Sequence, residues 1–228
     1  MGKAELDLDD VRGIAAEIDA EICALPTKNT PSVRAVRCRY SHSLRDADRE
    51  LILDLARELI EDYDHRWLAY ELIACHRAAF RGLREAELVE LGQGVNSWGS
   101  VDAFARILAG PAWLQWQVPD GLIHSWARSG DRWWRRAAVV STVALNARSH
   151  GGQGDVLRTL VVCRLLVTDQ DDLVVKAMSW ALRELIPHDP EAVQGFLHEY
   201  EGILAARVKR EVKNKLSTGL KNPGLKGV

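Results

Sequence analysis

Trp98 and Asp102 lie four residues apart in the segment Asn96-Ser-Trp-Gly-Ser-Val-Asp102. Residues at this spacing share one face of a helix, so an indole ring and a carboxylate would be presented together. An aromatic face attracts a cation, and a carboxylate can stabilise developing positive charge or activate a water molecule. The pair therefore fits chemistry on a cationic substrate, although Asp102 could instead form only an exposed ion pair with Arg106.

Two later segments carry further side chains that could join this site. Arg136 follows Asp131 within Asp131-Arg-Trp-Trp-Arg-Arg-Ala-Ala-Val-Val, and Trp180 stands in Val175-Lys-Ala-Met-Ser-Trp-Ala-Leu-Arg. Arg136 could bind a phosphate through its fork of N–H donors. It could equally be a solvated or core-edge cation linked to Asp131 or Asp102.

Length and composition predict a packed protein. The 228 residues suffice to bury a core without disulfide or metal support, and a 47% hydrophobic content excludes a mostly disordered chain. The four cysteines form no CxxC pair and the histidines have no zinc-ligand spacing, which predicts neither a metal site nor a disulfide framework. The acidic N-terminus is not typical of a signal peptide, and the most apolar stretch, 137–147, is too short for a membrane span. We expect a cytoplasmic protein.

Apolar residues recur at intervals of three and four along most of the chain, and no run of alternation indicates a strand. The sequence therefore predicts an all-α fold, with breaks where glycine or proline interrupts the pattern. The expected helices are 8–24, 45–62, 65–80, 84–91, 97–109, 119–128, 131–147, 154–168, 171–186 and 189–215.

A faint internal repeat accompanies this pattern. The pairs Leu68-Ala69, Asp102-Ala103, Arg136-Ala137 and Lys176-Ala177 follow one another at intervals of 34, 34 and 40 residues. Such intervals are typical of helical-pair repeats, which bury their apolar faces by stacking on neighbouring repeats. We therefore expect a curved superhelical stack, an α-solenoid, in which Asp102, Arg136 and Lys176 line one surface.

The net charge of −2 argues against a nucleic-acid binder when it is taken as a whole. The charge is unevenly distributed, however, because residues 5–21 are acidic and the C-terminal end is basic. A local basic face can coexist with a neutral total. Basic residues cluster at Arg34, Arg37, Arg39 and Arg45, at Arg128, Arg132, Arg135 and Arg136, and at Arg207, Lys209, Arg210, Lys213, Lys215, Lys221 and Lys226.

The order Trp98, Asp102, Arg136, Trp180 resembles the cleft of the DNA alkylation repair (AlkD-like) DNA glycosylases. The segments around Arg136 and Trp180, and Leu204-Ala-Ala-Arg-Val-Lys-Arg-Glu211, are similar to successive family segments, over roughly residues 35–216. Ser97 stands where some members have a second aromatic residue. The resemblance implies HEAT-like repeats in one domain, 1–216, followed by a flexible tail, 217–228.

The resemblance also implies an activity: a monomer that binds double-stranded DNA containing alkylated bases and hydrolyses the N-glycosidic bond of cationic purines such as N3-alkyladenine and N7-alkylguanine. It implies no cofactor and no metal, and association with the nucleoid. Two alternatives remain: a catalytically silent DNA-binding paralogue, and a helical-repeat scaffold that binds a protein.

The residue roles follow from the resemblance. Asp102 would stabilise positive charge on the deoxyribose, Trp98 and Trp180 would lie against the damaged nucleotide, and Arg136 would hold a phosphate. The further DNA contacts that we expect are Arg135, Lys176, Arg183, Lys209, Arg210 and Tyr40. The other six tryptophans are expected in the core: Trp67, Trp113, Trp116, Trp126, Trp133 and Trp134.

Overall fold

The computed structural model describes residues 8–224, and all regular elements in that range are helical. The prediction of an all-α fold of helical repeats is confirmed. The chain divides after Gln93 into two compact units. Repeats in a stack can separate in this way without forming independent domains, so a single domain over 1–216 stays a prediction.

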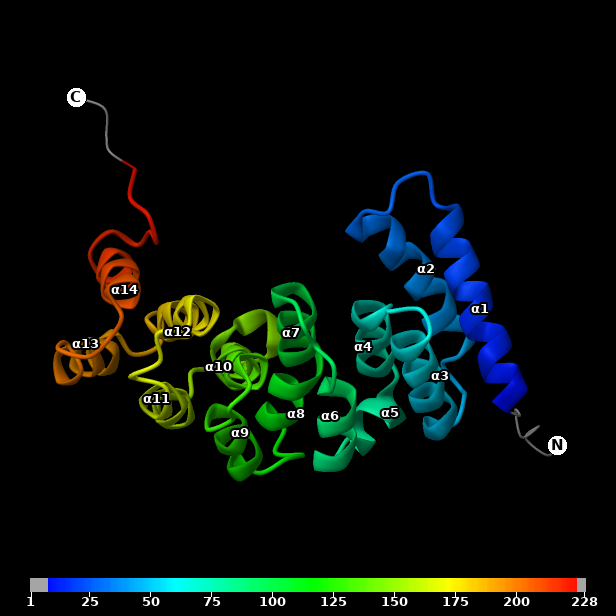
Figure 1. The fold of residues 1–228 in the computed structure, drawn as a ribbon, viewed down its shortest axis with the longest axis horizontal. Coiled ribbons are helices and arrows are strands. Elements are labelled where there is room, and N and C mark those ends of the chain that lie inside the picture. The colour runs from blue at the N-terminus through cyan, green and yellow to red at the C-terminus, as the bar shows by residue number, and fades with distance from the viewer. Residues whose placement is uncertain (1–7, 225–228) are drawn as a thin grey trace. The chain divides into compact units, whose positions relative to one another are not determined.

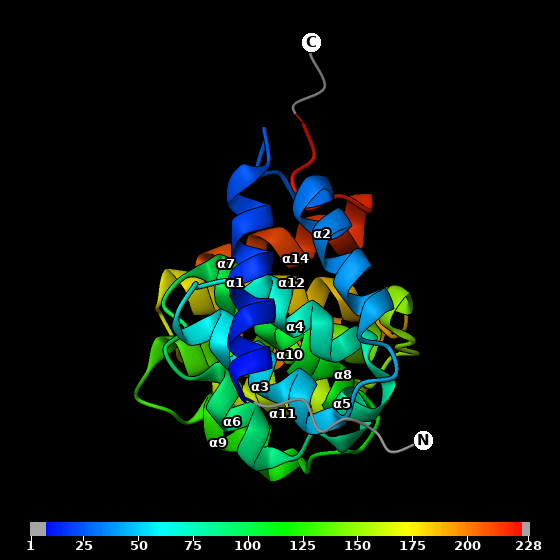
Figure 2. The same cartoon turned by 90° about the vertical axis from the view of Figure 1, so that its right-hand side faces the viewer.

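The first unit contains α1 (Leu8–Ala24), α2 (Thr30–Ser43), α3 (Arg49–Glu61), α4 (Arg66–Cys75), α5 (Arg77–Gly82) and α6 (Glu85–Gly92). Its core forms where α3 packs on α1 and α4, and α2 packs on α1 and α4. Figure 2 faces α1 and shows α2 beside it. Leu55, Leu59, Leu68 and Ile73, which recur at helical spacing, are fully buried between these helices.

The second unit contains α7 (Trp98–Phe104), the π-helical turn η1 (Ala105–Ala109), α8 (Gly110–Leu114), α9 (Asp120–Ala127), α10 (Arg132–Asn146), the short 3-10 turn η2 (Arg148–His150), α11 (Val156–Leu165), α12 (Asp172–Leu185), α13 (Pro190–Glu199) and α14 (Ala206–Thr218). Helices α7, α10, α12 and α14 pack in succession to form one layer, with α9, α11 and α13 in the other (Figure 1). We call the first of these the α7–α14 layer. Helix α10 lies at its centre and is buried from Arg136 to Asn146.

Three helices of the α7–α14 layer begin in the same way. The side chains of Ser97, Asp131 and Asp171 cap α7, α10 and α12 by accepting hydrogen bonds from backbone N–H groups of the first turn. Five residues after these caps stand the residues predicted to be equivalent: Asp102, Arg136 and Lys176. The three helices therefore share one register.

Ion pairs join neighbouring repeats at the same interval. Their partners lie 33 to 38 residues apart in the sequence. These repeat-spanning ion pairs are Arg34 and Arg37 with Glu71, Arg49 with Glu87, Arg57 with Glu90, Arg135 with Asp169, and Arg136 with Asp102. The repeat period seen faintly in the sequence is thus the period of the polar contacts.

The predicted helix boundaries were wrong at several places. Helix α2 was missed because Pro31 was read as a break, whereas proline is tolerated in the first helical turn, here after the Asn29 cap. The predicted helix 65–80 ends at Cys75, because the His76 side chain caps α5. The predicted helix 189–215 is split by a turn over 200–205. Helix α14 ends at Thr218, and residues 225–228 of the predicted tail lie outside the described residues.

The predicted break at Gly110-Pro111 is instead a wider helical turn. The Gly110 N–H bonds to the carbonyl of Ala105, five residues back, and α8 continues from there with Pro111 in its first turn. Proline has no N–H to satisfy, so the change of register accommodates it. Among the described residues, no helix is long and apolar enough to cross a membrane.

Gly110 is also the point of closest approach between α8 and α10. A methyl group there would lie 2.7 Å from the carbonyl oxygen of Ser141 and 2.8 Å from Cβ of Ala144. We expect Gly110→Ala to lower the free energy of unfolding by about 1–3 kcal/mol through overpacking. The matched control is Gly195→Ala on α13, where nothing lies within 4 Å, and it should raise stability by about 0.5–1 kcal/mol. Urea unfolding of both variants checks this prediction, and equal stabilities would contradict it.

Candidate functional site

Asp102 lies on α7 and is held by Arg136 of α10. Nε of Arg136 donates to Oδ1 of Asp102 at 2.8 Å, and Nη2 donates to Oδ2 at 2.7 Å. This parallel, two-bond pairing fixes the plane of the carboxylate. The Asp102 side chain remains 16% exposed, so it is not fully enclosed. The expected ion pair with Arg106 does not form; Arg136 is the partner.

The Arg136 guanidinium is enclosed by three helices. Its side chain is 7% exposed, and Nη1 donates to the backbone carbonyl of Leu173 at the start of α12. Asp131, the other expected partner, instead caps α10 by accepting from the Trp133 N–H. Arg136 therefore connects α7, α10 and α12, and a phosphate could reach it only if these contacts rearranged.

Trp98 occupies the first turn of α7, and 66% of the residue is exposed. The indole is therefore accessible to a ligand. The helix that carries it begins at a defined cap, because Ser97 caps α7 and exchanges hydrogen bonds with Ser100. Ser97 thus positions both Trp98 and Asp102. This role was not predicted, although serine before a helix is a capping signal.

Trp180 lies on α12, half-buried, with both its edge and one face occupied. The indole Nε1 donates to Oε1 of Glu184 at 3.0 Å. The guanidinium carbon of Arg106 lies 5.4 Å from the centre of the ring, within the range of a cation–π contact. Arg106, which follows Asp102 by one turn, was considered only as a partner for that carboxylate; its contact with Trp180 could not be read from the sequence.

After Arg136, three more of the predicted DNA-binding cations form contacts within the protein. Arg135 pairs with Asp169 and donates to two backbone carbonyls, which leaves its side chain only 21% exposed. Lys176 pairs with Asp172 at 2.6 Å but stays exposed. Arg183 donates to Ser179, and its burial lowers its pKa. Of these three, Lys176 is the one that remains most accessible to a ligand.

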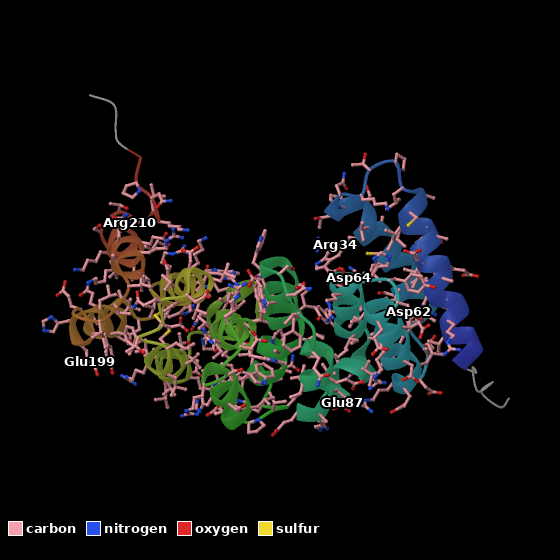
Figure 3. All side chains as sticks on the ribbon, in the orientation of Figure 1. Arg34, Asp62, Asp64, Glu87, Glu199 and Arg210 are labelled. Carbon is pink, nitrogen blue, oxygen red and sulfur yellow. The ribbon has the colours of Figure 1, made fainter. Side chains whose placement is uncertain are left out.

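Helix α14 supplies the remaining predicted cations of this layer. Lys209 donates to the carbonyl of Glu201. Arg210 extends from α14 (Figure 3), is exposed, and forms no ion pair among the described residues. Nη1 of Arg207 lies 3.4 Å from Oδ1 of Asp172 and forms an ion pair with it. Arg210 is therefore the predicted contact on this helix that is most open to an anion.

Tyr40 lies on α2 in the first unit. Its hydroxyl donates to Glu21 at 3.0 Å, and burial together with this bond raises its pKa to about 12. The surrounding arginines are also paired: Arg34 and Arg37 with Glu71, Arg39 with Glu21, and Arg45 with Asp46. Arg34 projects from α2 (Figure 3). The basic cluster seen in the sequence is thus neutralised by carboxylates from elsewhere in the same unit, and a DNA contact by Tyr40 stays a prediction.

Of the six tryptophans expected in the core, Trp113 and Trp126 are buried, and Trp67, Trp133 and Trp134 are half-buried. Trp116 is different, because it is 70% exposed. Its backbone adopts a left-handed conformation with φ of 59°, and its ring rests on the buried Arg158, 4.0 Å from the guanidinium carbon. The expectation of a core position was wrong for Trp116.

The fold and the site define a class: a helical-repeat protein that presents an exposed indole beside a carboxylate held by arginine. The model of the family described as DNA alkylation repair enzyme matches residues 28–216. The chain therefore belongs to the DNA alkylation repair enzyme family, and its role lies in the repair of alkylated DNA. No curated protein and no solved structure gave a match.

Proposed function

We propose that the protein is a DNA glycosylase that removes cationic alkylated purines, such as N3-alkyladenine and N7-alkylguanine, from duplex DNA. The observation that carries this proposal is the geometry of Asp102. Its carboxylate is held in one plane by Arg136, its side chain remains partly exposed, and it lies one helical turn from the exposed Trp98. A fixed negative charge beside an open aromatic face suits a substrate on which positive charge develops.

The chemistry of the substrate requires few catalytic groups. An alkylated purine already carries positive charge, so cleavage of the N-glycosidic bond returns the bonding electrons to the base and releases it neutral. The deoxyribose becomes oxocarbenium-like and is attacked by water at its anomeric carbon. In this proposal Asp102 stabilises the positive charge on the sugar and orients, or accepts a proton from, the attacking water.

Trp98 and Trp180 would contact the damaged nucleotide. Trp98 offers an open face, on which a cationic base or sugar would gain on the order of 1 kcal/mol. Trp180, which is half-buried, would contact the nucleotide through the part of its ring that remains exposed. Arg136 is assigned a different role from that expected from the sequence: it positions Asp102 rather than holding a phosphate.

The test is the release of free base from duplex DNA treated with a methylating agent, with and without protein, because these lesions also depurinate spontaneously. Binding to the same duplex is measured in parallel against salt concentration, since DNA binding weakens steeply as salt rises. Release above background supports the glycosylase. Salt-sensitive binding without release of any methylated purine overturns it in favour of the silent paralogue, and the absence of both favours a protein-binding scaffold.

The silent paralogue is the second candidate because of one observation. The Asp102 carboxylate has an internal partner for each oxygen, as a purely structural ion pair would have. Such a protein would recognise DNA through the α7–α14 layer without cleaving it. The base-release assay separates the two candidates directly.

Trp98→Ala provides a test of the aromatic contribution. We expect base release to fall about fivefold, because the lost cation–π interaction is worth about 1 kcal/mol. The melting temperature should not change, since the side chain is largely exposed. Trp116→Ala is the matched control, as it removes an equally exposed indole outside the site. An unchanged rate in Trp98→Ala would contradict the role of this ring.

A further inference from the structure

Arg106 lies in the π-helical turn that follows Asp102. Residues four apart on an α-helix share one face and can pair. Here α7 ends at Phe104, the wider turn over Ala105–Ala109 begins, and both carboxylate oxygens of Asp102 are bound by Arg136 instead. Such turns are frequent at functional sites.

The guanidinium of Arg106 is left with an aromatic partner and no acidic one. It lies over the Trp180 ring, is exposed, and forms no ion pair within residues 8–224. The pKa of His150 is lowered mainly by burial and, second, by the positive charge of Arg106. Arg106 is therefore an uncompensated positive charge close to both Asp102 and Trp180.

No hydrogen bond among the described side chains uses the N–H donors of Arg106. A guanidinium that lies over an aromatic ring can still direct its N–H donors to two oxygens of a phosphate. Arg136 does not have this freedom, because its donors are directed to Asp102 and Leu173. The phosphate contact that the sequence suggested for Arg136 is thus open to Arg106.

We propose that Arg106 binds the DNA backbone phosphate beside the lesion and, through its cation–π contact, positions the Trp180 ring. Arg106 is a binding and positioning residue in this assignment. The inference rests on the proposed DNA-binding role of the α7–α14 layer. It does not depend on base release, so its tests use unmodified duplex.

The first test is the salt dependence of duplex binding by Arg106→Ala and Arg106→Lys. Loss of one phosphate contact lowers the slope of log affinity against log salt by about 0.9. We expect this decrease in Arg106→Ala and not in Arg106→Lys, which keeps the charge. The matched control is Arg164→Ala, which removes an exposed arginine from α11 in the other layer. A wild-type slope in Arg106→Ala, or the same decrease in Arg164→Ala, overturns the phosphate contact.

The second test reports on the Trp180 ring. Protein labelled with 5-fluorotryptophan gives one fluorine resonance for each tryptophan, and Trp180→Phe identifies the resonance of interest. We expect Arg106→Ala and Arg106→Lys both to shift that resonance, because alanine removes the guanidinium that lies over the ring and lysine replaces it with a compact ammonium group. A resonance unchanged in both variants overturns the positioning role. If the wild-type protein releases no base while both tests succeed, the glycosylase proposal fails and the assignment of Arg106 stands.

Discussion

Asp102→Asn is expected to lower the rate of base release by about 10²–10³-fold, the loss found when one preorganised electrostatic group is removed from an active site. Asparagine keeps the size and shape of the side chain but removes its negative charge. It therefore withdraws the interaction that grows as the sugar becomes positive. It also leaves the buried Arg136 guanidinium without a charged partner, so the rate is measured where urea unfolding shows the variant to be folded. Affinity for undamaged duplex should remain within a few-fold of the wild-type value, because Asp102 is not a phosphate ligand in this proposal.

The measurement is single-turnover release of methylated purine by saturating protein, so that chemistry rather than product release limits the rate. Asp54→Asn is a matched control, since Asp54 pairs with Arg57 on α3 and lies outside the α7–α14 layer. A wild-type rate in Asp102→Asn would remove this residue from the mechanism. A slower rate in Asp102→Asn that is fully explained by weaker DNA binding would also remove Asp102 from the mechanism.

Arg136→Ala is expected to lower the free energy of unfolding by about 3–5 kcal/mol, because it leaves the Asp102 carboxylate without its partner inside the protein. The loss should be near the upper end of that range, as the guanidinium also bonds to Leu173 and so joins three helices. Base release should fall together with stability. Urea unfolding provides the measurement, and Arg132→Ala, one turn earlier and 53% exposed, should cost no more than about 1 kcal/mol.

A double variant separates stability from catalysis. Replacing both partners, as in Asp102→Leu with Arg136→Met, removes the unpaired charge, and apolar replacement of a buried ion pair is often close to neutral. We expect most of the stability lost in Arg136→Ala to return while base release remains absent. If Arg136→Ala were as stable as the wild-type protein, the pair would not hold the three helices together. If the double variant released base, the carboxylate would not be needed.

The sequence was sufficient to predict the helical repeats, and it placed Asp102 and Arg136 at equivalent positions of neighbouring repeats. The 34-residue interval between Asp102 and Arg136 is the interval at which the structure forms its repeat-spanning ion pairs. The periodicity of apolar residues and the repeat spacing are local or regular signals, so they can be recognised in the sequence without knowledge of the packing. The helix starts after Ser97, Asp131 and Asp171 follow from the same kind of information.

What each cation binds could not be predicted from the sequence. Arg135 stands in a basic run but meets Asp169, which comes from the next repeat, and Arg136 turns to the previous repeat for Asp102. Whether an arginine pairs with a carboxylate of the next or of the previous repeat depends on how the helices stack and on which side chain is more deeply buried. The contact of Arg106 with Trp180 depends further on one π-helical turn, whose only trace in the sequence is Gly110-Pro111.

The repeat-spanning ion pairs join residues that are close in the sequence, and this affects when they can form during synthesis. Each pair closes over 33 to 38 residues, so it can form as soon as the following repeat has left the ribosome, without waiting for the C-terminus. Asp102 can meet Arg136 once α10 has emerged. The bond from Arg136 to Leu173 is added only with α12. The order of synthesis thus allows the carboxylate to be oriented before the basic helix α14 exists.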